Sequence, residues 1–283
     1  MLWRRFLTGA GEFMFVRKEL QFPHKAILTS TMLNEIYSYP RELSRLILSE
    51  YGNGIICGLD YSIKDGDLIL SSGIFRLNGE IYLLRDNLNI SELAEKNSLV
   101  NSTRYFITFE KKSCDKEPCL TEKNLELVFT KEKPACTLGS FVFLERKKFS
   151  LPTLTNENNP FENIFRRSVL NLLEVPFAEM QGATFHPLLF RLVKIFLSQK
   201  KNKTPFDYAI LVHLLNNQTL SSQTLVEYII SENKTFNIRN REEFFKTFLL
   251  CLCQSKFNVA IYKNDMELNN SAPRKTKPIG KLI

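Results

Sequence analysis

Six cysteines are the residues best suited to metal or redox chemistry in this sequence of 283 residues. They are Cys57, Cys114, Cys119, Cys136, Cys251 and Cys253. None of the spacings is C-x-x-C, and the stretch from Cys114 to Cys136 supplies three thiolates without a clear fourth ligand for a tetrahedral zinc site. We therefore expect reduced, partly buried thiols and no bound metal.

The other common marks of catalysis are also missing. The three histidines are His24, His186 and His213, and none lies in a ligand spacing such as H-E-x-x-H. The single Gly-Lys pair, Gly280-Lys281, lacks the upstream glycine of a phosphate-binding loop, and Gly52-x-Gly54 leads into a strand instead of a helix. No G-x-S-x-G elbow is present. The sequence predicts neither an enzyme nor a cofactor, although glycosidase carboxylates, which can lie far apart in a chain, stay open.

Positive charge exceeds negative charge, with 38 Lys and Arg against 30 Asp and Glu and a formal net charge of +8. Most basic residues are interleaved with acids along the chain. The exception is the C-terminal end, where the basic residues are Arg274, Lys275, Lys277 and Lys281. Two interpretations fit this end: a solvated tail, or an arm that contacts phosphates.

No window approaches the roughly 18 apolar residues that a membrane span needs. The N-terminus also lacks the apolar stretch of about 7–15 residues that a signal peptide contains. We therefore expect no membrane span and synthesis in the cytoplasm. A second methionine, Met14, stands at the start of the first strand-like segment, so residues 1–13 fit a dispensable extension or translated upstream sequence.

Apolar periodicity predicts the elements of the first half. Residues 14–22 fit a short strand, and 30–51 fit a pair of helices of which Pro40 begins the second. Apolar residues then alternate up to Leu84, with hairpin signals at Asp65-Gly66 and Asn78-Gly79, so we expect an antiparallel meander. The elements expected after it are a helix over 90–97 and strands over 104–110, 124–130 and 138–145, with 111–123 as a hairpin excursion or a loop.

After residues 150–159, a linker by composition, the apolar period changes from two to about 3.6. The helices expected there are 160–174, 187–200, 205–217, 222–231 and 241–255, and 257–262 is a last strand or an extended tail. The predicted fold class is α+β: an N-terminal helical pair and antiparallel β-meander domain, followed by an all-α bundle. The predicted units are 1–24 (extension and first strand), 25–149, the linker 150–159, 160–262 and the basic tail 263–283.

The segment from Tyr51 to Leu84 carries a pattern of glycine turns, YGNGIICGLDYSIKDGDLILSSGIFRLNGEIYLL. The order G-x-G-[IV]-x-x-G-L, a hairpin and then L-x-[LV]-x-x-G resembles an N-terminal module of phage baseplate and tail-fibre-attachment proteins, found also in phage-derived particles of Firmicutes. Pro40-Arg41-Glu42-Leu43 fits the layout of that module, whereas Ser72 stands where proline usually precedes the third-strand glycine. The resemblance covers about 25–110 of the chain.

This resemblance implies a non-enzymatic structural protein of a phage tail, baseplate or phage-like particle, oligomeric and in contact with other tail or baseplate subunits. It implies a final location in the virion or the particle. On this interpretation, four glycines let the meander turn tightly and let neighbouring chains approach its backbone. They are Gly54, Gly58, Gly73 and Gly79. The alternative is that they are ordinary hairpin glycines.

Two other functions stay open. The first is a nucleic-acid-binding accessory protein of a helicase or replication complex, which would use the basic surplus. Tyr61, Tyr82 and Tyr105 are then candidates for base stacking, but they fit core positions or cross-strand pairs as well. The second is a carbohydrate-active or carbohydrate-binding protein at a fibre tip.

Overall fold

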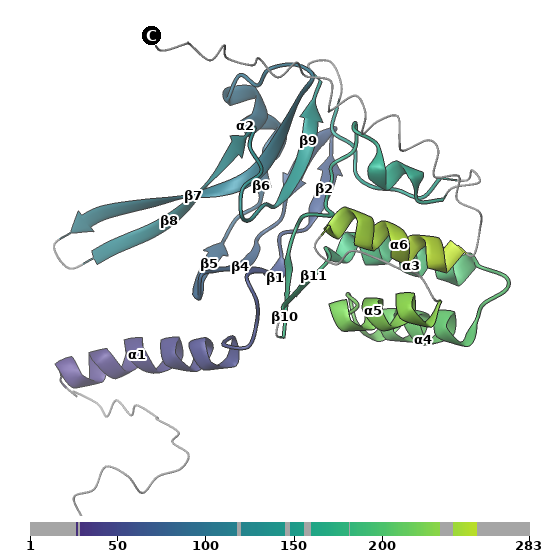
Figure 1. The fold of residues 1–283 in the computed structure, drawn as a ribbon. Coiled ribbons are helices and arrows are strands. Elements are labelled where there is room, and N and C mark those ends of the chain that lie inside the picture. Colours follow the sequence, from purple (N-terminus) through teal and green to yellow (C-terminus); the bar gives the residue numbers. More distant parts are fainter. Residues whose placement is uncertain are drawn as a thin grey trace, which may run out of the picture.

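The computed structural model describes residues 27, 29–117, 120–144, 148–155, 160–180, 182–232 and 240–253, with the backbone alone for those between 112 and 124. The helices are α1 (Ser30–Ile47), α2 (Ile90–Lys96), α3 (Pro187–Gln199), α4 (Pro205–Asn216), α5 (Ser222–Ser231) and α6 (Arg241–Cys253). The sheets lie in the centre, α3–α6 cover one side, and α1 stands apart below the sheets (Figure 1). Helices are thus combined with mainly antiparallel sheets, which confirms the mixed class that the sequence predicts.

The strands before residue 90 are β1 (Gly54–Gly58), β2 (Tyr61–Lys64), β3 (Asp67–Leu70), β4 (Gly73–Leu77), β5 (Glu80–Leu84) and β6 (Leu88–Asn89). The later strands are β7 (Thr103–Glu117), β8 (Leu120–Thr130), β9 (Gly139–Phe143), β10 (Phe177–Glu179) and β11 (Gly182–Thr184). Among the described residues they form one five-stranded sheet in the order β11-β10-β1-β4-β5. Two three-stranded sheets, β2-β3-β6 and β8-β7-β9, complete the arrangement.

The two predicted hairpin turns are confirmed. Lys64 pairs with Asp67 across the first turn, and Leu77 pairs with Glu80 across the second, so each loop has two residues. Both residues of each loop have positive φ, with 54° and 93° at Asp65-Gly66 and 52° and 81° at Asn78-Gly79. This is the type I′ geometry that these dipeptides favour.

One prediction that the structure contradicts is the helical pair over 30–51. A single helix, α1, runs from Ser30 to Ile47 and contains Pro40 in its interior. Proline inside a helix removes one backbone hydrogen bond and crowds the preceding turn. It therefore destabilises the helix but does not prevent it from forming. The apolar stripe continues in phase across Pro40, which suits one helix better than two.

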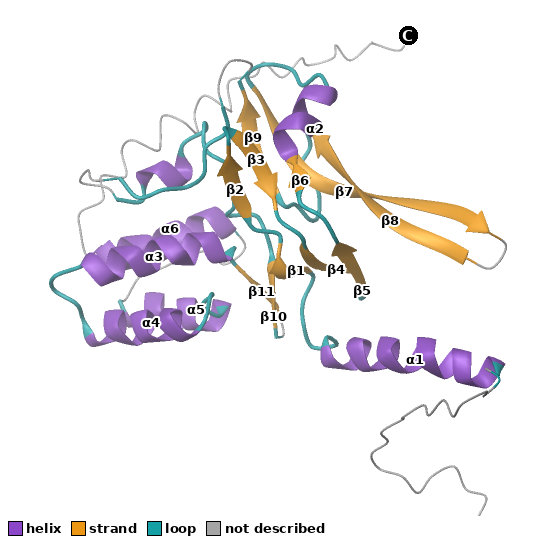
Figure 2. Ribbon diagram, turned by 180° about the vertical axis from the view of Figure 1, so that it is seen from behind, coloured by secondary structure: helices purple, strands orange, loops and turns teal. Residues whose placement is uncertain are grey.

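The predicted strands 104–110 and 124–130 belong to a longer hairpin. Strands β7 and β8 pair from Phe106–Thr130 out to Glu117–Leu120, so residues 111–117 and 120–123 continue the backbone hydrogen-bond ladder. The hairpin extends well beyond the sheets (Figure 2). Strand β9 pairs with the first part of β7, as Tyr105–Phe141 and Ile107–Gly139 show.

After residue 150 the chain adds two strands, β10 and β11, to the five-stranded sheet. The prediction for this part of the chain is an all-α bundle without strands in that sheet. Strand β10 pairs parallel with β1 at Ile55–Phe177, and β11 pairs antiparallel with β10. One cluster of buried side chains, from Ile55 to Leu252, joins the sheets and α3–α6. The predicted linker 150–159 is described as far as 155, and Ser150 is tied to Ser168 by a side-chain hydrogen bond of 2.8 Å. Elements on its two sides thus share a sheet and a core.

The predicted helix 160–174 is wrong. It is reduced to a short 3-10 helix, Glu162–Phe165. Asn171 pairs with Ser140 through two backbone hydrogen bonds, of 2.7 and 3.0 Å, and this bridge requires an extended backbone. The side chains that surround it are buried almost completely: Val169, Leu170, Leu172 and Leu173. A helix buries only the residues along one stripe, so it cannot bury every side chain of a continuous run. Pairing in the tertiary structure therefore overrides the local helical periodicity.

The remaining predicted helices are present as α3 to α6, within a few residues of their expected ends. Thr204 caps α4, and its capping box with Asp207 is complete. Arg241, the first residue of α6, donates to the carbonyl oxygens of Leu173, Val175 and Thr184 at 2.8–3.3 Å, which fastens α6 to the segment around β10 and β11. No described helix is both long enough and apolar enough to cross a bilayer.

Gly54 offers a test of the contact between the two halves of the chain. A methyl group there would lie 2.5 Å from the Pro176 carbonyl oxygen, and the residue has φ of +143°. We expect Gly54→Ala to lower the free energy of unfolding by about 3 kcal/mol or more, measured by urea denaturation, because backbone must move to admit the methyl group. The control is Gly182→Ala, where nothing lies within 4 Å. Equal stability of the two variants would contradict the role of this contact.

Candidate functional site

The glycines of the meander serve contacts inside the chain. A methyl group on Gly58 would overlap the Ser72 carbonyl oxygen, and one on Gly73 would lie 2.5 Å from the Leu59 nitrogen. Gly54 faces Pro176, whereas Gly79 has open space around it and occupies a turn with φ of +81°. These intrachain contacts account for three of the four predicted glycines, so their role in docking other chains stays a prediction.

Of the other predicted features, some lie within the described residues and some lie outside them. Tyr61 and Tyr105 are each 4 % exposed, so they are core residues and cannot stack on bases. Tyr61 donates to the Leu138 carbonyl oxygen at 3.0 Å, and burial raises its pKa. The predicted strands 14–22 and 257–262, the extension 1–13 and His24 lie outside the described residues, as does the basic tail with Arg274, Lys275, Lys277 and Lys281.

The cysteines with described side chains are not grouped. Cys57 is exposed, Cys251 is buried, and Cys136 and Cys253 are half-buried. Burial raises the pKa of Cys136 to about 11 and that of Cys253 to about 12, so both are thiols at neutral pH. No group of three or more metal-binding side chains occurs within the described ranges, which omit the side chains of Cys114 and Cys119.

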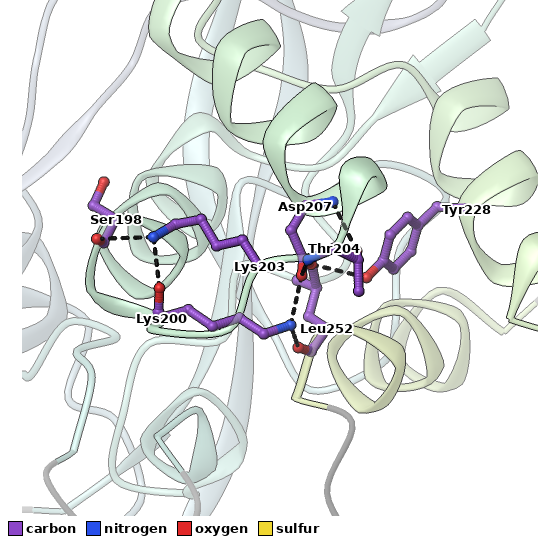
Figure 3. Close-up of polar contacts among 7 residues, drawn as sticks. All are labelled: Ser198, Lys200, Lys203, Thr204, Asp207, Tyr228 and Leu252. Carbon is purple, nitrogen blue, oxygen red and sulfur yellow. Dashed lines mark hydrogen bonds and ion pairs between the residues drawn. The ribbon is translucent and has the colours of Figure 1, made fainter.

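A buried polar cluster joins the ends of the helices (Figure 3). Lys200 donates to Asp207 Oδ2 at 2.7 Å and to the Leu252 carbonyl oxygen at 2.8 Å. The Asp207 carboxylate also accepts from the Thr204 backbone at 2.8 Å and from the Tyr228 hydroxyl at 3.2 Å. The cluster therefore ties together the end of α3, the start of α4, the middle of α5 and the end of α6.

Charge pairing in this cluster is complete, which identifies it as structural. Burial alone would raise the pKa of Asp207, but the Lys200 ammonium and the Thr204 hydrogen bonds outweigh burial and hold it below its ordinary value. Burial, reinforced by the Asp207 carboxylate, raises the pKa of Tyr228. A carboxylate that has a lowered pKa and accepts hydrogen bonds from three donors is a poor proton acceptor at neutral pH. The capping-box spacing Thr204-Pro205-x-Asp207 signals one of these bonds, whereas the Lys200 contact depends on tertiary packing.

His186 is the one buried residue whose side chain has an atom without a partner in the described part of the chain. Its Nδ1 accepts from the Leu188 backbone at 3.1 Å and so caps α3, while Nε2 has no hydrogen-bond partner. Burial lowers its pKa to about 4, although nearby Asp60 acts in the opposite direction. The imidazole is therefore neutral, which suits a core residue that sits 6.2 Å from the Tyr61 ring.

An apolar groove of about 450 Å³ lies between β5 and the β7–β8 hairpin. Its lining includes Phe75, Leu84, Phe109 and Leu127, with the Phe75 and Phe109 rings 4.8 Å apart. The hydroxyl of Tyr82 in its wall donates to Glu80 at 2.6 Å, and burial together with Glu80 raises the Tyr82 pKa to about 12. This lining favours apolar contact over proton transfer.

The strongest candidate for function is the uncovered side of α1, which we call the α1 apolar face. Its members are Leu33, Ile36, Tyr37, Leu43, Leu46 and Ile47, each 45–68 % exposed. No residue of α1 is buried, and both ribbon views show the helix apart from the sheets and from α3–α6 (Figure 2). The apolar periodicity that predicts this stripe gives no indication that the folded chain leaves it uncovered.

The low pKa of His186 generates a pH prediction. The unfolded chain binds a proton here below its ordinary pKa of 6.5, whereas the folded chain does so only near about 4, so stability is lost as the pH falls through this window. We expect the free energy of unfolding to drop by about 2 kcal/mol between about pH 7 and about pH 5, measured by urea denaturation.

Two variants isolate this effect. His186→Asn keeps an acceptor for the Leu188 backbone and is expected to remove most of the drop. His213→Asn alters an exposed residue of α4 and should leave the drop unchanged. If His186→Asn loses as much stability as the wild-type chain over the same pH range, the pH dependence has another source.

Comparison with known proteins supplies no assignment. No protein-family model matches the chain, and no curated protein matches it either. Among the described residues, the feature that the chain's own fold explains least is the α1 apolar face.

Proposed function

We propose that this protein is a structural assembly component, non-enzymatic, that acts through protein–protein contacts. The setting we propose is a phage tail, baseplate or phage-like particle, because the glycine-turn pattern from Tyr51 to Leu84 resembles a module of such assemblies. The protein would be made in the cytoplasm and end in the virion or the particle. The observation that carries the proposal is the α1 apolar face.

An uncovered amphipathic helix of this kind is unfavourable in an isolated molecule. An 18-residue helix is marginal in water without tertiary packing. Interior Pro40 costs about 3 kcal/mol more in helix stability. Most of the stability of protein helices comes from burial of an apolar face, and α1 buries none of its residues. A partner that covers the face would supply the missing stabilisation.

The rest of the described chain supports a role as a rigid carrier for this helix. Its core is continuous, the buried Asp207 carboxylate accepts from three donors, and its groove is lined mainly by apolar side chains. Such a body suits attachment better than turnover of a substrate.

Incorporation into particles tests the proposal. We would coexpress the chain with the tail-tube and baseplate proteins of the same phage or particle and separate assemblies on a density gradient. The wild-type chain is expected to sediment with the assemblies at fixed stoichiometry. Ile36→Glu/Leu43→Glu, which places two charges on the α1 apolar face, should remain at the top of the gradient.

Ser38→Glu is the matched control, because it adds a charge to the opposite side of α1 and should be incorporated normally. Complete particles that exclude the wild-type chain would refute the proposed function. Normal incorporation of Ile36→Glu/Leu43→Glu would show that another surface makes the contact.

A further inference from the structure

We infer that the partner of the α1 apolar face is α1 of other copies of this chain, with the helices parallel and side by side. This inference rests on the proposed assembly function and names the partner for it. It follows from four properties of α1: the spacing of its apolar residues, the width of the face, the placement of its charges and the area that it offers.

The spacing fits a helix as the partner. Leu33, Ile36, Pro40, Leu43 and Ile47 follow one another at intervals of three, four, three and four residues. Alternation of three and four produces a straight apolar seam of the coiled-coil type, which packs against a second helix with the same seam. An 18-residue helix gives this seam a length of about 27 Å.

The width of the face indicates more than two helices. At 3.6 residues per turn, Leu46 extends the stripe on one side and Tyr37 extends it on the other, so the face spans about half of the helix circumference. A seam for two helices is narrower than this, whereas helices in bundles of three or more bury a wider stripe. We therefore expect at least three copies.

The charges favour a parallel arrangement. Glu35 and Glu42 project along one flank of the face, and Arg41 projects along the other, where it also donates to the Tyr37 hydroxyl at 3.0 Å. In a parallel assembly with rotational symmetry, the acidic flank of each helix faces the basic flank of the next. In an antiparallel pair, each flank would meet its own copy and like charges would face each other.

Net charge argues against an anionic surface as the partner. The two acids of α1 are balanced by Arg41 and Arg45, so the helix carries no net charge. Amphipathic helices that bind anionic lipid, and segments that bind nucleic acid, carry a basic surplus on the polar side. A neutral helix with oppositely charged flanks suits a protein partner.

The available area is sufficient. Six large apolar side chains at about half exposure present about 500 Å² on each copy. Three copies that each bury the whole face remove about 1,500 Å² from water in total, which is the size of a standard specific interface.

Light scattering after size exclusion tests the inference on the purified full-length chain alone. The wild-type chain is expected to elute at three or more times 32.9 kDa, and Ile36→Glu/Leu43→Glu at 32.9 kDa. Ser38→Glu should elute like the wild-type chain. Circular dichroism checks that the body stays folded, which is expected because α1 buries nothing in it.

A wild-type monomer at micromolar concentrations would overturn self-association while leaving the proposed function intact, since another protein would then cover the face. Assembly that persists in Ile36→Glu/Leu43→Glu would also overturn the inference. Failure of the proposed function, by contrast, appears as absence from particles, whatever the mass of the purified chain.

Charge reversal tests the parallel orientation. Glu42→Arg should weaken self-association about tenfold, because it places a positive charge against Arg41 of the next copy. Adding Arg41→Glu in the same chain exchanges the two flanks and should restore association. An antiparallel assembly would respond in the opposite sense: Glu42→Arg would relieve repulsion and strengthen association.

Discussion

The close approach of two backbone segments organises this protein. Gly52 lies against Gly182, and Gly54 lies against Pro176, so closely that a side chain on either glycine would overlap the facing backbone. Gly52 donates to the Glu179 carbonyl oxygen at 3.0 Å, and Ile55 donates to that of Pro176 at 2.9 Å. These contacts allow β10 to join the sheet beside β1. The sheet in turn contributes to the core that α3–α6 cover, so the contact between the two halves of the chain depends on two positions without side chains.

The same contact fixes where α1 leaves the body. The segment between Ile47 and Gly54 is held at Tyr51, which bridges to Met180, and at Gly52. The C-terminal end of α1 therefore lies at the edge of the molecule, and the helix stands apart from the sheets (Figure 1). Its apolar side chains stay exposed there.

Local chemistry made several elements predictable. Asp65-Gly66 and Asn78-Gly79 require positive φ and form the expected type I′ turns, and Thr204-Pro205-x-Asp207 has the spacing of the capping box that it forms. These signals act within four residues, so the sequence displays them directly.

Contacts between residues far apart in the chain account for the elements that the sequence did not predict. The residues around Asn171 have helical spacing but pair with Ser140, and β10 depends on a partner more than 100 positions earlier. Lys200 donates to the Leu252 carbonyl oxygen, 52 positions later in the chain, and this contact joins the end of α3 to the end of α6. The α1 apolar face was visible as a stripe, yet its exposure follows from packing that a single sequence does not encode locally.

Hydrogen exchange of the α1 amides, followed by mass spectrometry at several protein concentrations, tests the central claim most directly. If α1 is covered by other copies, exchange over Leu33–Ile47 slows as the concentration rises while the amides of α3 stay equally protected throughout. Rapid exchange over Leu33–Ile47 at every concentration would contradict the claim that α1 binds α1.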